Sequence, residues 1–195
     1  MRDSLAFEPR NCQLVVVDVQ ARLAPAMPAE ARAWVGATLA LLGKAARLLG
    51  VPVTVTEHVP ERIGGTEPEV LAVFDAPTVL GKIHFGAANE DTFLAHVAGL
   101  GRDHVLVAGM EAHVCVLQTA LGLKARGYRV AMIADASCSR APLDEKVALD
   151  RARFHGIEPV TAEMVVFEWL HRADHPARRA VIDAIKARDA LRVRA

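Results

Sequence analysis

Residues 105–120 read Val-Leu-Val-Ala-Gly-Met-Glu-Ala-His-Val-Cys-Val-Leu-Gln-Thr-Ala. The apolar, β-branched start predicts a buried strand, Gly109 predicts a tight turn, and the residues from Glu111 or Ala112 onward predict a helix. Cys115 falls in the first turn of that helix, where unpaired N–H groups and a positive partial charge favour a thiolate. The stretch therefore predicts a parallel α/β fold and a nucleophilic cysteine placed beside donors for a developing oxyanion.

The rest of the chain repeats this alternation of strand and helix about six times. Predicted strands cover 14–19, 51–56, 78–83, 104–108, 128–134 and 158–161, and predicted helices cover 29–49, 89–98, 112–126, 144–154, 162–170 and 177–191. Residues 57–77 predict an irregular connection with one short helix. Helical crossovers place helices on both faces of a parallel sheet. We therefore expect a three-layer α/β/α, Rossmann-like fold with a six-stranded parallel sheet in the order 3-2-1-4-5-6, forming one domain over residues 1–195.

Composition narrows the function classes. The chain has 195 residues, 52% of them apolar, and its 23 basic residues balance its 23 acidic ones. Such a balance offers no field that would attract nucleic acid or an anionic membrane. The first residues lead to no secretion signal, no apolar run reaches membrane-spanning length, and the three cysteines show no paired spacing. We therefore expect a cytoplasmic protein that acts on a small molecule.

Three reactive residues fall at the carboxyl ends of predicted strands, where open parallel sheets bind their ligands. Asp18 ends the first apolar run, Lys82 lies near the end of the third strand, and Cys115 follows the fourth. In the expected order the first and fourth strands are neighbours, so Asp18 and Cys115 would face one crevice and Lys82 would reach it from the side.

Each of these residues also has a structural interpretation. Asp18 could hold a loop through hydrogen bonds, Lys82 could be a surface residue, and Cys115 could be an inert small hydrophobic residue. Their joint placement favours the functional interpretation. His113 lies two residues from Cys115 and so does not share its helix face; we consider it a pocket-lining residue, with a structural role as the alternative.

Metal and cofactor motifs are weak in this sequence. His58, His84 and His113 could approach one another near the strand ends, but their spacing matches no zinc motif. Gly64-Gly65 matches neither a P-loop nor a dinucleotide fingerprint. We therefore expect no bound metal and no cofactor.

Four segments resemble the isochorismatase-like cysteine hydrolases, and most closely the branch of isochorismatase domain-containing proteins. They are residues 16–23, 82–86, 109–120 and 135–140. The resemblance implies an Asp-Lys-Cys triad, which maps onto Asp18, Lys82 and Cys115. It also implies a cis peptide bond between Met110 and Glu111, which would aim the N–H groups of Glu111 and Cys115 at one oxygen.

The resemblance further implies a substrate pocket and an oligomer. We expect the pocket to be lined by Gln20, Phe85, Met110 and His113, and to be closed by the 57–77 loop or by a neighbouring subunit. The family usually assembles into dimers or larger oligomers, so we expect a homo-oligomer.

Two departures from relatives in the same superfamily shape the expected reaction. Nicotinamidases have an Asp-x-His metal site after the second strand, where this chain reads Thr56-Glu57-His58. Isochorismatases that cleave a vinyl ether lack the cysteine that is present here as Cys115. We therefore expect a hydrolase that cleaves an amide or related C–N bond through a cysteine thioester. The alternatives are a catalytically silent binding or scaffold protein of the same fold and, less favoured, thiol redox chemistry between Cys115 and Cys138.

Overall fold

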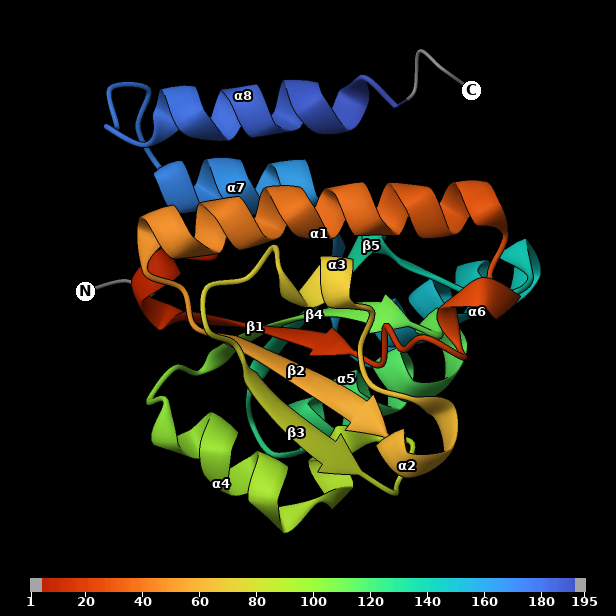
Figure 1. The fold of residues 1–195 in the computed structure, drawn as a ribbon. Coiled ribbons are helices and arrows are strands. Elements are labelled where there is room, and N and C mark those ends of the chain that lie inside the picture. The colour runs from red at the N-terminus through yellow and green to blue at the C-terminus, as the bar shows by residue number, and fades with distance from the viewer. Residues whose placement is uncertain (1–4, 192–195) are drawn as a thin grey trace.

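The computed structural model describes residues 5–191, and its centre is a parallel sheet of six strands (Figure 1). The strands are β1 Cys12–Val17, β2 Val53–His58, β3 Thr78–Lys82, β4 His104–Met110, β5 Arg129–Cys138 and β6 Glu158–Val160. Their order is β3-β2-β1-β4-β5-β6. The predicted fold class and strand order are therefore confirmed.

Helices cover both faces of this sheet. One face carries α1 Ala29–Leu49 and α7 Ala162–Leu170, and α8 Arg178–Asp189 packs on the outside of these two helices at the top of Figure 1. The other face carries α4 Asp91–Gly99, α5 Leu117–Ala125 and α6 Pro142–Phe154. Short helical segments complete the fold: η1 Pro9–Asn11, η2 Ala24–Ala26, α2 Pro60–Ile63, α3 Pro68–Leu71, η3 Ala87–Asn89 and the π-helical turn η4 Ala112–Val116.

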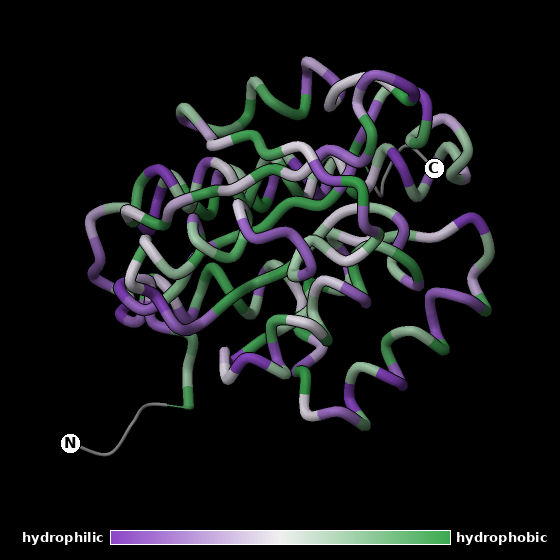
Figure 2. Tube along the Cα trace, turned by 90° about the horizontal axis from the view of Figure 1, so that it is seen from below, coloured by the Kyte–Doolittle hydropathy of each residue, from purple (hydrophilic) through white to green (hydrophobic). Residues whose placement is uncertain are grey.

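The alternation of side chains along β1 explains the two hydrophobic cores. Leu14 and Val16 belong to the core under α1 and α7, whereas Val15 and Val17 belong to the core under α4 and α5. All four are fully buried, as expected for a central parallel strand covered on both faces. Figure 2 shows hydrophobic segments running through the middle of the molecule and hydrophilic ones on outer turns.

Gly109 permits the close approach of β1 and β4 next to the site described below. It pairs with Val17 and has a φ of +121°. A Cβ atom at this position would overlap the Val17 carbonyl oxygen, so no other residue fits without moving the strands.

The structure differs from the sequence-based expectations mainly after β4. The predicted helix over 112–126 is divided into η4 and α5, because the carbonyl of Glu111 accepts the N–H of Val116 five residues on. The connection predicted as irregular contains two short helices, α2 and α3. Over residues 5–191, no helix combines the length and the apolar character needed to cross a membrane.

Candidate active site

The carboxyl ends of four adjacent strands bring the three predicted reactive residues together. Asp18 follows β1, Lys82 ends β3, and Cys115 lies in η4, which follows β4 after one residue. β2 lies between β1 and β3, and β4 lies on the other side of β1. The site therefore occupies the edge of the sheet at which parallel α/β folds bind ligands.

Asp18 lies just outside the strand rather than inside it, because β1 ends at Val17. Its backbone is left-handed, with a φ of +53°, a conformation that Asp tolerates better than most residues. Its N–H donates to the Thr56 carbonyl at 3.1 Å, and its Oδ1 accepts the Thr56 hydroxyl at 2.8 Å. Thr56 of β2 thus holds both the backbone and the carboxylate of Asp18.

Lys82 forms a buried ion pair with Asp18. The Lys82 Nζ lies 2.7 Å from Asp18 Oδ2. The ammonium also donates to the carbonyls of His84 at 3.1 Å and Phe85 at 3.0 Å. These three acceptors match the three N–H donors of an ammonium group. Oδ2 has no N–H or O–H donor besides Lys82 within residues 5–191, so it is the carboxylate oxygen with room to accept a proton.

The Cys115 thiol lies close enough to Asp18 and Lys82 for both side chains to act on its ionisation. Cys115 is only 5% exposed. Burial first, and then the charge of Asp18, raise the pKa of this thiol to about 12, while Lys82 acts in the lowering direction. The expectation that this cysteine ionises more readily than a free one is therefore wrong. Desolvation outweighs the field of the helix end, which here belongs to a π-helical turn.

The backbone before Cys115 has the predicted unusual geometry. The Met110–Glu111 peptide bond is cis. The Glu111 carbonyl accepts the N–H groups of Val114 and Val116, so those two donors are not free for a ligand. The Glu111 carboxylate is held by Arg140, whose backbone N–H and Nε–H donate to Oε2 at 3.2 and 2.9 Å. The N–H groups of Glu111 and Cys115 stay our predicted oxyanion donors.

The four residues predicted to line a pocket have different surroundings. Gln20 is fully buried and its amide forms three hydrogen bonds to the backbone of His58 and Gly64, so it clamps the end of β2 to the following loop. Met110 is fully buried within the core under α1. The Phe85 side chain is largely exposed.

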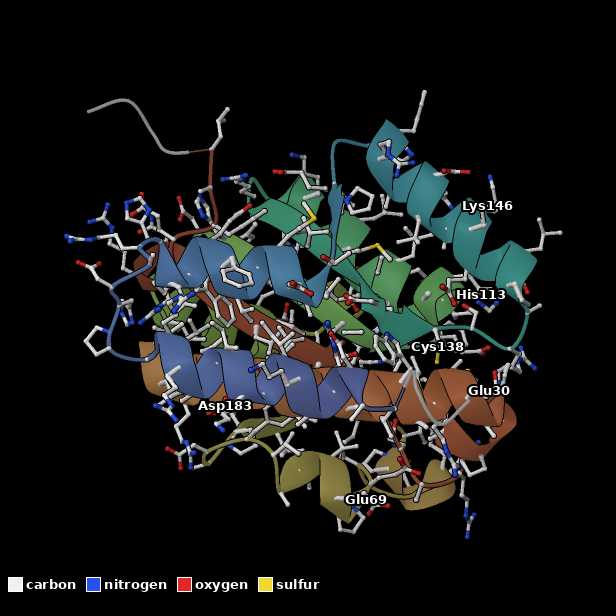
Figure 3. The ribbon with its side chains drawn as sticks, turned by 90° about the horizontal axis from the view of Figure 1, so that it is seen from above. Glu30, Glu69, His113, Cys138, Lys146 and Asp183 are labelled. Carbon is white, nitrogen blue, oxygen red and sulfur yellow. The ribbon has the colours of Figure 1, made fainter. Side chains whose placement is uncertain are left out.

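His113 has two polar neighbours that follow β5. Its Nδ1 lies 2.9 Å from the Ser139 hydroxyl, and its Nε2 lies 3.9 Å from the Asp144 carboxylate. Figure 3 labels His113 beside α6 and Cys138 at the end of β5. These contacts link η4 to α6, so both ring nitrogens of His113 face residues that follow β5.

His58 is a site neighbour that sequence reasoning considered only as a metal ligand. It is the register partner of Lys82 across β2 and β3, and its ring stacks on Phe85 with centroids 5.1 Å apart. Within residues 5–191, no group of three or more His, Cys, Asp or Glu residues is placed to hold a metal ion. One signal in the sequence could have identified His58 as a neighbour of the site. It lies two residues after Thr56, so the two side chains share one face of β2.

Comparisons with known proteins agree with this fold. A model of the isochorismatase domain matches residues 12–164. Isochorismatase domain-containing protein 1 of Salmo salar is 37% identical over 142 residues, which cover 73% of this chain and 50% of that protein. Isochorismatase domain-containing protein 2A of Mus musculus is 31% identical over 186 residues, covering 91% and 84%. The chain spans about half the length of the first curated relatives that it matches.

Solved structures show the same arrangement. The MAR1 ribonuclease of Caenorhabditis elegans has a TM-score of 0.86 at 28% identity, covering 93% of this chain and 92% of that one. YcaC of Pseudomonas aeruginosa, solved with hexane-2,5-diol and covalent acrylamide, has a TM-score of 0.84 at 21% identity, covering 98% and 97%. YcaC of Escherichia coli, described as an octameric hydrolase of unknown specificity, has a TM-score of 0.82 at 20% identity, covering 98% and 92%. The chain therefore belongs to the isochorismatase family.

Proposed function

We propose that this chain is a cysteine hydrolase that cleaves an amide or related C–N bond of a small molecule through a thioester intermediate. One observation carries the proposal: a thiol, a carboxylate and an ammonium meet in a buried site, with Asp18 and Lys82 2.7 Å apart and Cys115 in contact with both. A nucleophile next to a base that a third group orients is the recurring arrangement of covalent catalysis.

In the first half-reaction the thiol is deprotonated only as it attacks. The high pKa of Cys115 keeps the proton on sulfur at rest. As the sulfur forms a bond to the carbonyl carbon, its proton moves to Asp18, and the carbonyl electron pair moves to oxygen. The N–H groups of Glu111 and Cys115 receive that oxyanion; one such donor contributes about 3 kcal/mol to lowering the barrier.

The first half-reaction ends with the release of the amine, and water then regenerates the thiol in the second. The oxyanion collapses, the C–N bond breaks, and the leaving amine takes the proton from Asp18. Asp18 then accepts a proton from water while the water oxygen attacks the thioester. The C–S bond breaks and the sulfur takes the proton back, so one water is consumed per bond cleaved. Lys82 keeps its charge throughout and stabilises the anionic form of Asp18.

The decisive experiment screens small amides, ureides and nitrile-derived compounds against the wild-type protein and a Cys115→Ala variant. We expect turnover by the wild type, none by the variant, and an acyl adduct on Cys115 in the intact mass when the reaction is stopped early. Cys138→Ala is the matched control, because Cys138 is also buried and its pKa is also raised to about 12. Undiminished hydrolysis by Cys115→Ala would rule the proposal out.

The alternative function is that of a catalytically silent protein, which binds small molecules without cleaving them. In such a protein Cys115 would be an inert buried thiol like Cys12, whose pKa burial also raises to about 12. A limited dose of acrylamide separates the two. The acrylamide adduct reported for YcaC of Pseudomonas aeruginosa makes this a suitable probe. Preferential labelling of Cys115 supports the hydrolase, and equal slow labelling of all three thiols supports the silent protein.

The same proposal covers the assembly of the protein. The Escherichia coli YcaC structure is described as octameric, and we propose a homo-oligomer here as well. A small-molecule substrate, one domain over residues 1–195 and a cytoplasmic location belong to the same hypothesis. Light scattering of the purified chain tests the assembly, and a monomer at all concentrations would contradict it.

A further inference from the structure

His58 lies in the same layer as the residues that hold the catalytic carboxylate. It is two residues after Thr56 on β2, so the two side chains share one face of the sheet. Thr56 donates its hydroxyl to Asp18, and His58 pairs in register with Lys82 on β3. The imidazole is therefore next to both charged members of the triad, whose charges act on it.

The position of the imidazole is fixed from two directions. The backbone N–H of His58 donates to Gln20 Oε1 at 2.7 Å, and its carbonyl accepts Gln20 Nε2 at 3.0 Å. The ring stacks on Phe85 with an interplanar angle of 30°. Since the Phe85 carbonyl also holds Lys82, the stacked pair is tied to the catalytic cation through the backbone.

One ring nitrogen of His58 has no partner. Nδ1 is buried and makes no hydrogen bond within residues 5–191. The His84 backbone acts on the ring in the direction that favours its protonated form. Because Nδ1 has no partner, this effect falls on Nε2, so the neutral ring carries its proton there and Nδ1 is left as an acceptor. Burial and the neighbouring Lys82 charge lower the pKa of His58, which keeps the ring neutral and the acceptor available.

We propose that His58 is a substrate-binding residue that accepts, through Nδ1, a hydrogen bond from an N–H group of an uncharged amide, while Phe85 forms an apolar wall beside it. This inference rests on the proposed function, since it names the substrate class of the same site. A buried acceptor without a partner disfavours a ligand that lacks a donor, because the acceptor then stays unsatisfied. The site should thus prefer amides with a free N–H over N,N-dialkyl amides.

Two matched probes test the preference without a known substrate. Acrylamide has a free NH2 group, and N,N-dimethylacrylamide has none. The alkylation rate of Cys115 is measured with each probe by peptide mass spectrometry, and the ratio of the two rates is divided by the ratio found with free cysteine. Three proteins are compared: the wild type, His58→Phe, which keeps a flat ring without an acceptor, and His58→Asn, whose Oδ1 approximates the position of Nδ1. Thermal unfolding of each variant reports on the fold.

We expect the wild type to prefer acrylamide beyond the intrinsic ratio, by roughly fivefold, which corresponds to one neutral hydrogen bond. His58→Phe should lose the preference and His58→Asn should regain part of it. A ratio that is intrinsic in the wild type, or that persists in His58→Phe, overturns the role of His58 while leaving the proposed function intact. If neither probe labels Cys115 faster than Cys12, the proposed function fails, and the role of His58 fails with it.

Discussion

The Asp18 carboxylate and the Lys82 ammonium lie 2.7 Å apart, and their side chains are 0% and 1% exposed. Two charges buried this deeply depend on each other, because removing one leaves the other unpaired in a medium of low polarity. The pair therefore contributes to the stability of the fold as well as to the proposed chemistry. Its contribution to stability can be measured apart from activity by unfolding experiments.

The first prediction is a double-mutant cycle on this pair. Lys82→Met should lower the free energy of unfolding by about 3–5 kcal/mol, because Asp18 loses its counter-charge. Asp18→Asn combined with Lys82→Met should lower it by less than the sum of the single changes. Urea unfolding followed by circular dichroism provides all four values. Additive losses would show that the two charges are energetically independent.

The second prediction concerns the ionisation of Cys115. The Asp18 charge raises the pKa of the thiol, and Lys82 lowers it. Asp18→Asn should therefore lower the pKa of Cys115 and increase its thiolate fraction at neutral pH, even though amide hydrolysis is lost with the base. Lys82→Met should act in the opposite direction. The pKa of Cys115 is measured by ultraviolet titration of its thiolate in a protein with Cys12 and Cys138 replaced by Ala. Shifts of the same sign in the two variants would contradict the prediction.

The third prediction compares two buried threonines. The Thr56 hydroxyl donates to the Asp18 carboxylate at 2.8 Å, so Thr56→Val should cost about 1.5–3 kcal/mol of stability, the range for a hydrogen bond to a charged group. The Thr38 hydroxyl on α1 is buried without a partner in the described part of the chain. Thr38→Val removes an unsatisfied group and should be neutral or stabilising. Equal losses of unfolding free energy in the two variants, measured by chemical denaturation, would contradict this difference between the two hydroxyl groups.

The fourth prediction tests the close approach of β1 and β4. Gly109→Ala forces a Cβ against the Val17 backbone at a φ of +121° and should destabilise the protein severely, disturbing η4 as well. Gly36 lies within α1, and the position that a Cβ would take there has no neighbouring atom within 4 Å, so Gly36→Ala should stabilise by about 0.5–1 kcal/mol. Differential scanning calorimetry of both variants distinguishes packing from helix propensity.

The fifth prediction is a loss of stability at alkaline pH. Burial raises the pKa of Cys12, Cys115 and Cys138 from 9.0 to about 12. The folded state thus holds these protons more tightly than the unfolded state does. This contribution is complete below pH 9 and falls as the pH rises from there towards 12. Replacing Cys12 and Cys138 by Ala should make the decline shallower, and an unchanged slope in urea unfolding would contradict this.

Much of the architecture was predictable from local patterns. The apolar, β-branched runs and the helical crossovers predict a parallel sheet, and the observed order β3-β2-β1-β4-β5-β6 is the doubly wound order expected for it. Asp18, Lys82 and Cys115 were expected at one edge because parallel strands share their carboxyl ends.

Other features depend on contacts between distant segments and leave little trace in the sequence. The π-helical turn η4 follows from hydrogen bonds to the Glu111 carbonyl, which no residue pattern specifies. The pKa of Cys115 depends on how deeply the thiol is buried, and a helix-end argument cannot supply that depth. Gln20 was expected to face a ligand, but its amide joins His58 to the loop at Gly64, which is a tertiary relationship.

The dispersal of the triad along the chain has a kinetic consequence. Asp18, Lys82 and Cys115 follow or end three different strands, and a fourth strand, β2, separates two of them. Their encounter requires contacts of high sequence separation, which form slowly during folding. Because folding buries the Cys115 sulfur, its protection from a thiol reagent is a clock for refolding that reports when these strands have come together.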